Sequence, residues 1–434
     1  MKLSCALALG LTLVWFGTGA GKASALNAPH TLHRTRTATP HLTETGHARG
    51  HRAAAHSARS AAQSSATHAP AKATPVRHRG RSSARAAATV RRASLNVGRH
   101  RFSERFTASS FASGNIFEGD ITAGEDPVVR QAAIDALDGM NGTAVVIDPS
   151  NGRILAMVNQ RLALSPGAEP CSTIKITVAM AALSEGLVTR DTQVQLAGFR
   201  MNMTQALAHS NNLYYEELGR ELGFQRVRHY ATQFGLGELA GYQIQGEQLG
   251  AYPDKELPAS EGGVARMCSF GQGVSLTPLQ LGAYVAAIAN GGTLYYLQHP
   301  ISASEVAQYQ PKVKRTLDIA RYIPDLQDGM AGAVEYGTAR RLRANFHELP
   351  VFGKTGTCSD KGTRFGWFAS YSDSPQGSLV TVFFLEGGRP TFGPRAAELT
   401  GEFYKNLWDR NYFAEKGPQT AQVVAPDSSS RAER

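Results

Sequence analysis

The stretch Glu169-Pro170-Cys171-Ser172-Thr173-Ile174-Lys175 precedes an apolar, alanine-rich run from Ile176 to Leu183. A turn-like entry followed by a helical pattern predicts that Ser172 lies at or near a helix N-terminus. Lys175 is three residues further on, so a helix places its amine about one turn from the serine hydroxyl. A serine becomes a good nucleophile when a base takes its proton, and the free N–H groups and dipole of a helix start favour a neutral lysine. The pattern therefore indicates a nucleophilic serine with a lysine base.

Two later stretches strengthen this interpretation, because a serine three residues before a lysine also occurs by chance as a plain N-cap. Ser210-Asn211-Asn212 and Lys354-Thr355-Gly356-Thr357 follow in that order along the chain. Alone, Ser-Asn-Asn is typical of a turn or a helix cap. The three motifs in this order resemble the signature of penicillin-binding proteins and serine β-lactamases. The resemblance covers roughly residues 133–408 and includes Gly337-Thr338-Ala339, which is similar to a family stretch before the Lys-Thr-Gly strand.

The hydrophobic pattern predicts an α+β fold. Helices are expected over Pro127–Leu137, Met203–Leu222 (with Ser210-Asn211-Asn212 inside it), Thr277–Asn290 and Ala396–Trp408. Strands are expected over Gly142–Asp148, Arg153–Asn159, Pro350–Cys358, Phe365–Tyr371 and Leu379–Glu386. These elements predict an antiparallel β-sheet flanked by helices, with a mostly helical lobe inserted between the first and last strands, as in β-lactamases and transpeptidases. Thr277 is the expected N-cap and Pro278 the first residue of its helix.

The resemblance implies catalytic roles for four residues. Ser172 attacks a carbonyl carbon and is acylated, and Lys175 is the general base. Ser210 relays the proton towards the leaving amine. Lys354 supplies positive charge that assists this relay and attracts the substrate carboxylate. No organic cofactor and no metal is expected at such a site.

The resemblance also implies residues that bind the substrate. Asn212 hydrogen-bonds the substrate amide, and the hydroxyls of Thr355 and Thr357 assist Lys354. Gly356 has no side chain to block the close approach of its strand to the substrate. The backbone N–H groups of Ser172 and Thr357 are the expected oxyanion hole.

The cysteines flank these motifs. Cys171 immediately precedes the expected nucleophile, and Cys358 immediately follows Lys354-Thr355-Gly356-Thr357. Given the resemblance, the two positions face each other, and a disulfide between them is similar to one in some class A carbapenem-hydrolysing β-lactamases. The alternative is two independent, small buried residues. Cys268 is then unpaired or displaces one of them.

The first 25 residues contain a basic start, an apolar run from Leu3 to Phe16, and Ala23-Ser24-Ala25. This arrangement is typical of a secretory signal peptide with its cleavage site, and the alternative is an uncleaved membrane anchor. Either interpretation predicts an exported protein that acts in the periplasm or elsewhere outside the cytoplasm.

The formal net charge of +10 belongs largely to the segment that follows. Residues 26–101 contain 14 Lys and Arg against the single acidic residue Glu44. The segment 26–114 has too few large apolar residues to fold and is expected to be a disordered basic linker. It is either a solvated spacer or an attachment to anionic wall polymer or lipid headgroups, and its scattered histidines lack a metal-ligand spacing. Export argues against nucleic acid as a partner.

The folded domain is expected at 115–414, with regular structure from about Asp126 and a polar C-terminal tail over 415–434. Three functions remain open. The first is a peptidoglycan D,D-transpeptidase or D,D-carboxypeptidase that acts on stem peptides ending in D-Ala-D-Ala and is acylated by β-lactam antibiotics. The second is a serine β-lactamase, which needs a carboxylate to activate the deacylating water. The nearest candidate, Glu247, lacks the family spacing and is expected to be an exposed loop charge. The third is a non-catalytic penicillin-binding sensor or wall-attachment protein.

Overall fold

The computed structural model describes residues 108–389 and 391–415. The signal peptide or anchor predicted over residues 1–25, the linker over residues 26–107, and the tail beyond residue 415 lie outside the described residues. Among the helices that the model describes, none combines the length and the apolar character that crossing a bilayer requires.

A five-stranded antiparallel sheet forms the centre of the fold, in the order β2-β1-β9-β8-β7. Its strands are β1 (Gly142–Asp148), β2 (Arg153–Val158), β7 (Val351–Asp360), β8 (Thr363–Ser372) and β9 (Leu379–Gly387). The last three strands are adjacent in sequence and in space, as their alternating apolar runs predict. Strand β7 is an edge strand, so one side of its backbone faces another element or substrate instead of a sixth strand.

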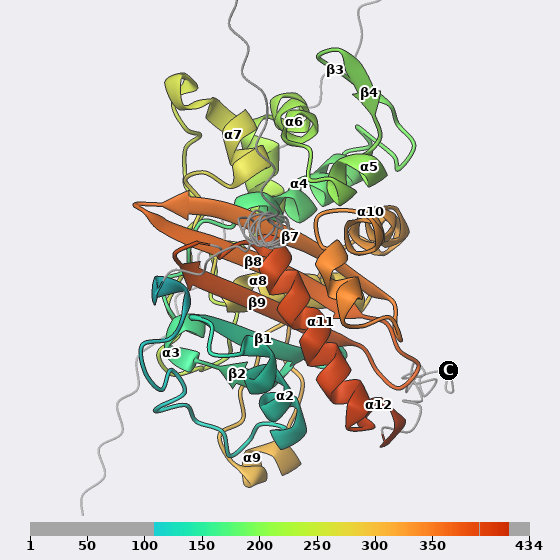
Figure 1. Ribbon diagram of the computed structural model, residues 1–434. Helices are drawn as coiled ribbons and strands as arrows, with labels where there is room; N and C mark the ends of the chain where they lie inside the picture. The colour runs from blue at the N-terminus through green and yellow to red at the C-terminus, as the bar shows by residue number, and fades with distance from the viewer. Residues whose placement is uncertain (1–107, 390, 416–434) are drawn as a thin grey trace, which may run out of the picture. The chain divides into compact units, whose positions relative to one another are not determined.

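Both faces of the sheet are covered, because successive side chains of a strand point to opposite faces. On β1, Val145 and Ile147 join the core that contains helix α8 (Pro278–Ala289). Ala144 and Val146 join the core formed with α2 (Pro127–Leu137) and α11 (Gly393–Asp409). Figure 1 shows α2 and α11 crossing the near face of the sheet, with α8 behind it. The α+β class with helices on both faces is confirmed.

The polypeptide between β2 and β7 forms the inserted lobe, which is mostly helical as expected. Its helices are α3 (Gln160–Ala163), α4 (Ile174–Ser184), α5 (Met203–Ala208), α6 (Asn212–Gln233), α7 (Gly263–Phe270), α8, α9 (Ala303–Ala307) and α10 (Ile323–Glu335). Short 3₁₀ turns are η3 (Cys171–Thr173), η4 (Ala259–Glu261), η5 (Ala320–Tyr322) and η6 (Arg340–Ala344). Two small hairpins, β3–β4 (Val194–Leu196, Phe199–Met201) and β5–β6 (Thr293–Tyr295, Val313–Thr316), complete it. The short helix α12 (Tyr412–Glu415) follows α11.

Helix α8 begins where the sequence predicts. The Thr277 hydroxyl accepts a hydrogen bond from Gln280 N (3.1 Å), and the Gln280 side chain accepts one from Thr277 N (3.0 Å). This reciprocal capping box satisfies two backbone donors, and Pro278 occupies the first helical position without losing a hydrogen bond. The capped helix packs its apolar residues against the back of the sheet.

Packed structure begins earlier than Asp126, where regular structure was expected. A short 3₁₀ turn, η2, spans Ala108–Ser110, and the carbonyl of Ser110 accepts a hydrogen bond from Asn141 N (2.8 Å). Phe111 forms a bridge with Met140. Residues before the expected domain boundary at 115 therefore already contact the end of the sheet. The sequence pattern gave no sign of this, because the segment has no periodic apolar face.

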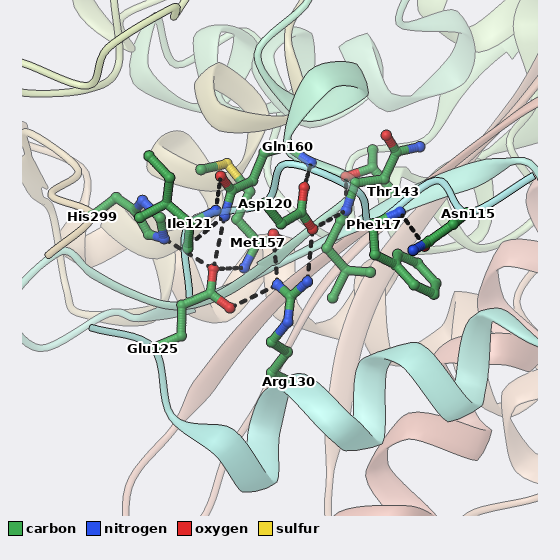
Figure 2. A network of polar contacts seen from close by, with 12 residues as sticks. Asn115, Phe117, Asp120, Ile121, Glu125, Arg130, Thr143, Met157, Gln160 and His299 are labelled. Carbon is green, nitrogen blue, oxygen red and sulfur yellow. Dashed lines mark hydrogen bonds and ion pairs between the residues drawn. The ribbon is translucent and has the colours of Figure 1, made fainter. Parts of the chain in front are cut away.

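A buried polar network fixes the segment before α2 to the body of the domain (Figure 2). The guanidinium of Arg130 bonds the carboxylates of Asp120 (2.7 Å) and Glu125 (2.8 Å). Glu125 also bonds His299 Nε2 (2.9 Å) and accepts from the backbone N–H of Met157 (3.0 Å). The two carboxylates are 4% and 1% exposed, so their charges depend on these partners and not on water.

Candidate active site

The serine lies where a 3₁₀ turn passes into a helix. Ser172 is the middle residue of η3, and α4 follows directly from Ile174. The expectation that Ser172 lies at or near a helix N-terminus is confirmed. Lys175 is in the first turn of α4 and is fully buried, because α4 is apolar on nearly every side. A buried helix start gives the serine and the lysine a fixed geometry.

The second motif interrupts a helix and does not lie within one. The helix expected over residues 203–222 is split into α5, which ends at Ala208, and α6, which begins at Asn212. Ser210 has a left-handed backbone (φ +56°), which ends α5. The Asn211 side chain then caps α6 by accepting a hydrogen bond from Tyr214 N (3.0 Å). The break directs Ser210 and Asn212 towards Lys175.

Three predicted side chains meet at the amine of Lys175. Its Nζ is 2.7 Å from Ser172 Oγ, 2.7 Å from Asn212 Oδ1 and 3.3 Å from Ser210 Oγ. The first distance is that of a strong hydrogen bond, within which a proton can pass. A single amine therefore contacts both serine hydroxyls from two motifs that are far apart in sequence.

Burial changes the ionisation of both lysines. The pKa of Lys175 is lowered to about 6, first by burial and then by the positive charge of Lys354, with Glu216 opposing the shift. Burial lowers the pKa of Lys354 to about 7. At neutral pH Lys175 is therefore mainly a neutral amine, which is the form that can accept a proton from Ser172.

The edge strand β7 brings the third motif to the serine. Lys354 is fully buried, and its Nζ donates to the carbonyl of Thr355 (3.0 Å). A Cβ on Gly356 would lie 2.8 Å from the carbonyl oxygen of Pro170 and 3.1 Å from Cγ2 of Thr173. In the structure this glycine allows β7 to lie close to the turn before Ser172, and the expected close approach to substrate stays a prediction.

The two threonines of this motif have different surroundings. Thr355 is buried, and its hydroxyl donates to the hydroxyl of Thr338 (2.7 Å). Thr357 is exposed, and its hydroxyl accepts from the backbone N–H of Gly393 at the start of α11 (2.8 Å). The hydroxyl of Thr357 is therefore the one that can reach a ligand in solvent, and a substrate role for Thr355 remains a prediction.

Thr338 connects the second motif to the third, a role that the sequence did not assign. Besides accepting from Thr355, it donates its backbone N–H to the carbonyl of Ala208 (3.1 Å), two residues before Ser210. The neighbouring Gly337 is required there, because a Cβ would lie 2.2 Å from that carbonyl oxygen. The sequence offered only the similarity of Gly337-Thr338-Ala339 to a family stretch. That similarity did not indicate which residues Thr338 contacts.

A disulfide joins Cys171 to Cys358, with the two Cα atoms 5.6 Å apart. It is the pairing that the resemblance implies. Cys268 is a buried free thiol beside Gly219, where α7 packs on α6. The bridge connects the residue before Ser172 to the residue after the Lys-Thr-Gly-Thr motif.

Comparison with known proteins identifies the family of this chain. The family model described as "Penicillin binding protein transpeptidase domain" matches residues 142–405. The chain belongs to this family. The match includes all three motifs and both cysteines of the disulfide.

Two curated relatives are similar to this transpeptidase-family chain. Stage V sporulation protein D of Bacillus subtilis strain 168 is 28% identical over an alignment of 322 residues that covers 62% of this chain and 49% of the relative. Peptidoglycan D,D-transpeptidase MrdA of Acinetobacter baumannii is 24% identical over 359 residues, covering 64% and 52%. The chain thus spans about half the length of the curated relatives it matches.

Solved structures share the fold. The transpeptidase domain of Burkholderia pseudomallei penicillin-binding protein 3 has a TM-score of 0.57 at 19% identity, covering 68% of this chain and 97% of that one. Penicillin-binding protein 2 of Pseudomonas aeruginosa, in complex with WCK 5153, has a TM-score of 0.56 at 22% identity, covering 70% and 78%. At these identities the likeness concerns the fold of the transpeptidase domain.

Two aromatic side chains lie near the Lys175 amine of this candidate site. Its Nζ is 5.7 Å from the ring centre of Tyr215 and 5.9 Å from that of Phe270. The guanidinium of Arg266 stacks on the ring of Phe270, with its Cζ atom 3.8 Å from the ring centre. These rings help to keep water from the amine, which contributes to its lowered pKa. Nothing in the sequence pattern pointed to them.

A cavity of the domain lies apart from the predicted site residues. A cavity of about 580 Å³ is lined by Gln160, Tyr242, His299 and Tyr309 among others, and includes none of the predicted site residues. The convergence of Ser172, Lys175, Ser210 and Lys354 locates the chemistry, since it offers a nucleophile in contact with a base.

Proposed function

We propose that this chain is a penicillin-sensitive serine D,D-transpeptidase or D,D-carboxypeptidase that acts on peptidoglycan stem peptides through a Ser172 acyl-enzyme. One observation carries the proposal. The Ser172 hydroxyl is 2.7 Å from a buried lysine amine whose pKa is lowered to about 6. The proposal is also supported by the name of the relative from Acinetobacter baumannii, which is a peptidoglycan D,D-transpeptidase.

In the proposed acylation step, Lys175 takes the proton of Ser172 as its oxygen attacks the carbonyl carbon of the penultimate D-Ala. The proton then passes through Ser210, which is 3.3 Å from the same amine, to the leaving D-Ala nitrogen. The backbone N–H groups of Ser172 and Thr357 stabilise the negative charge on the carbonyl oxygen. Breaking the peptide bond releases D-Ala and leaves the ester on Ser172.

Asn212, Lys354 and Thr357 orient the substrate for this step. Asn212, whose Oδ1 contacts Lys175, retains an amide N–H₂ group for the substrate backbone. Protonated Lys354 attracts the terminal carboxylate, and the exposed Thr357 hydroxyl binds it. Deacylation by an amine of a second stem gives a cross-link, and deacylation by water gives a trimmed stem.

Glu247, the candidate that the sequence offered for the β-lactamase alternative, has a structural role. Glu247 is not the exposed loop charge that was expected. It is half-buried, its pKa is raised by burial, and its carboxylate accepts hydrogen bonds from the backbone N–H groups of Ala240 (2.8 Å) and Gly241 (3.0 Å). A carboxylate that caps a turn in this way is a structural group. Without an activated water, a penicilloyl-enzyme is long-lived.

The deciding experiment is acylation of the full chain by a fluorescent penicillin, followed by washout. Stable labelling of the parent and none of Ser172→Ala is the expected result. Ser304→Ala, at an exposed serine on α9, is the matched control and should label fully. Label lost within seconds with hydrolysed drug would instead indicate a β-lactamase. No labelling of the parent would contradict the proposal.

Turnover separates the enzyme from a sensor. A peptide that ends in D-Ala-D-Ala should release D-Ala from the parent and not from Ser172→Ala. An added amine acceptor should give a cross-linked product if transpeptidation is the native reaction. Acylation without release of D-Ala would favour the penicillin-binding sensor.

We place this activity outside the cytoplasm, where peptidoglycan lies, and the disulfide agrees with an oxidising compartment. We propose that residues 1–25 direct export and that the basic segment that follows spaces the domain from the membrane or contacts anionic polymer. N-terminal sequencing of the exported protein distinguishes a cleaved signal, with Leu26 as first residue, from an uncleaved anchor.

A further inference from the structure

The residue before the proposed nucleophile has an unfavourable backbone. Cys171 has φ +52°, in the left-handed region that glycine adopts readily and that a residue with a Cβ adopts at a cost. It is 1% exposed and opens η3, so its conformation sets the direction from which Ser172 enters α4. Non-glycine residues persist in this region when the surrounding structure holds them there.

The surrounding structure holds this turn to the sheet. The disulfide fixes the Cys171 side chain to Cys358 at the end of the Lys-Thr-Gly-Thr motif. Two residues earlier, the carbonyl of Glu169 accepts a hydrogen bond from Trp367 Nε1 (3.0 Å) on β8. The Pro170 carbonyl lies directly against Gly356 of β7. The disulfide is the one covalent member of these attachments.

We propose that the Cys171–Cys358 disulfide is a positioning device for the nucleophile. It holds Cys171 in its left-handed conformation and thereby keeps Ser172 Oγ at hydrogen-bonding distance from Lys175 and facing β7. The inference rests on the proposed acylation of Ser172. It assigns the disulfide a role beyond stabilisation of the fold, because the bridge selects one backbone conformation at the reacting residue.

Loss of the bridge should therefore harm acylation through the backbone of residue 171 and not only through stability. A glycine at that position adopts a left-handed backbone without a Cβ penalty, whereas an alanine does not. Two variants that both lack the bridge and differ by a single methyl group can separate these effects. They are Cys171→Gly with Cys358→Ser, and Cys171→Ala with Cys358→Ser.

The test measures penicillin acylation of the full chain over a range of drug concentrations, so that the first-order acylation rate and the half-saturating concentration are obtained separately. The glycine pair should acylate about tenfold faster than the alanine pair at saturation. The half-saturating concentration should change little between them. A stabilising cross-link alone would not produce this difference in the first-order rate.

The melting temperatures of the two double variants, compared with that of the parent, show how much stability each variant loses with the bridge. Equal saturating rates for the glycine and alanine pairs would overturn the inference, as would an alanine pair as fast as the parent. If the parent itself is not labelled, the proposed function fails and not this inference specifically. The free thiol Cys268 is present in all forms, so it does not influence the comparison.

Discussion

At the residue scale, two buried lysines share one site, and the positive charge of Lys354 adds to burial in lowering the pKa of Lys175. Lys175 is next to the serine, and Lys354 is the neighbouring charge that opposes its protonation. The proposed chemistry needs the first neutral and the second positively charged. Their ordering, with a pKa of about 6 below one of about 7, permits both forms together.

This ordering predicts a bell-shaped pH profile. Below about pH 6 Lys175 is protonated and cannot accept the Ser172 proton, so the acylation rate should rise with pH through about 6. Above about pH 7 Lys354 loses the charge that attracts the substrate carboxylate, so the rate should fall. The two limbs describe the coupled pair of lysines and not either residue alone. Rates of penicillin acylation across pH measure this.

Lys354→Arg is the control for the alkaline limb. Arginine keeps its charge to high pH, so that limb should disappear while the acid limb remains. A profile that is flat from about pH 5 to 9 in the parent would contradict the assignment of Lys175 as base.

The glycine of the Lys-Thr-Gly motif gives a second prediction. A Cβ on residue 356 would lie 2.8 Å from the Pro170 carbonyl and push the turn before Ser172 away from β7. Gly356→Ala should therefore slow acylation roughly 10- to 100-fold, because small displacements of a nucleophile have large kinetic effects. Gly114→Ala is the matched control, since no atom lies within 4 Å of its Cβ position. Equal rates for the two variants would show that β7 can retreat freely.

At the element scale, helix ends determine where functional groups lie. Ser210 and Asn212 are brought to Lys175 by the end of α5 and the start of α6, and Ser172 by the passage from η3 to α4. A continuous helix through residues 203–222 would project Ser210 and Asn212 in different directions, since positions two apart do not share a face. The break is therefore part of the site.

The N-cap of α8 allows the contribution of a helix end to be measured as a change in the free energy of unfolding. Thr277→Ala removes an acceptor from a buried helix start and should lower the free energy of unfolding by about 1 kcal/mol or more. Ser302→Ala removes the equivalent cap of α9, a five-residue helix with no buried residue, and should cost much less. Chemical denaturation measures both. Equal losses would mean that burial of the capped helix does not matter.

At the scale of the whole molecule, the segment before α2 is joined to α2 itself and to two distant parts of the domain through buried charge (Figure 2). Asp120 accepts from the backbone N–H groups of Asn159 and Gln160 at the end of β2, and Glu125 bonds His299 beyond α8. Arg130 neutralises both carboxylates from α2. The network fastens the start of the fold to its centre.

Removal of the cation should therefore be costly. Arg130→Met leaves two buried carboxylates without their counter-charge and should lower the free energy of unfolding by about 3–5 kcal/mol. Arg220→Met is the control, because Arg220 forms its ion pairs with Glu216 and Glu217 at the surface. This substitution should change the free energy of unfolding by less than about 1 kcal/mol. Urea denaturation of the full chain gives both values. A loss below about 1 kcal/mol for Arg130→Met would show that water replaces the guanidinium.

Local sequence determined a large part of this protein. The strands of the sheet, the helices α2, α8 and α11, and the pairing of Ser172 with Lys175 follow from periodicity, caps and a three-residue spacing. These features depend on interactions between residues within a few positions of one another, so short segments of sequence are enough to predict them. Three motifs in a fixed order then indicated the family.

Only the tertiary structure decided the rest, because contacts between distant segments have no local signal. The helix break at Ser210, the link from Thr338 to Thr355, and the capping role of Glu247 depend on neighbours in space. The same holds for the lowered pKa values of Lys175 and Lys354, since burial by the whole fold causes them. The sequence supplied a serine and two lysines, and packing into a dry interior made one lysine a base.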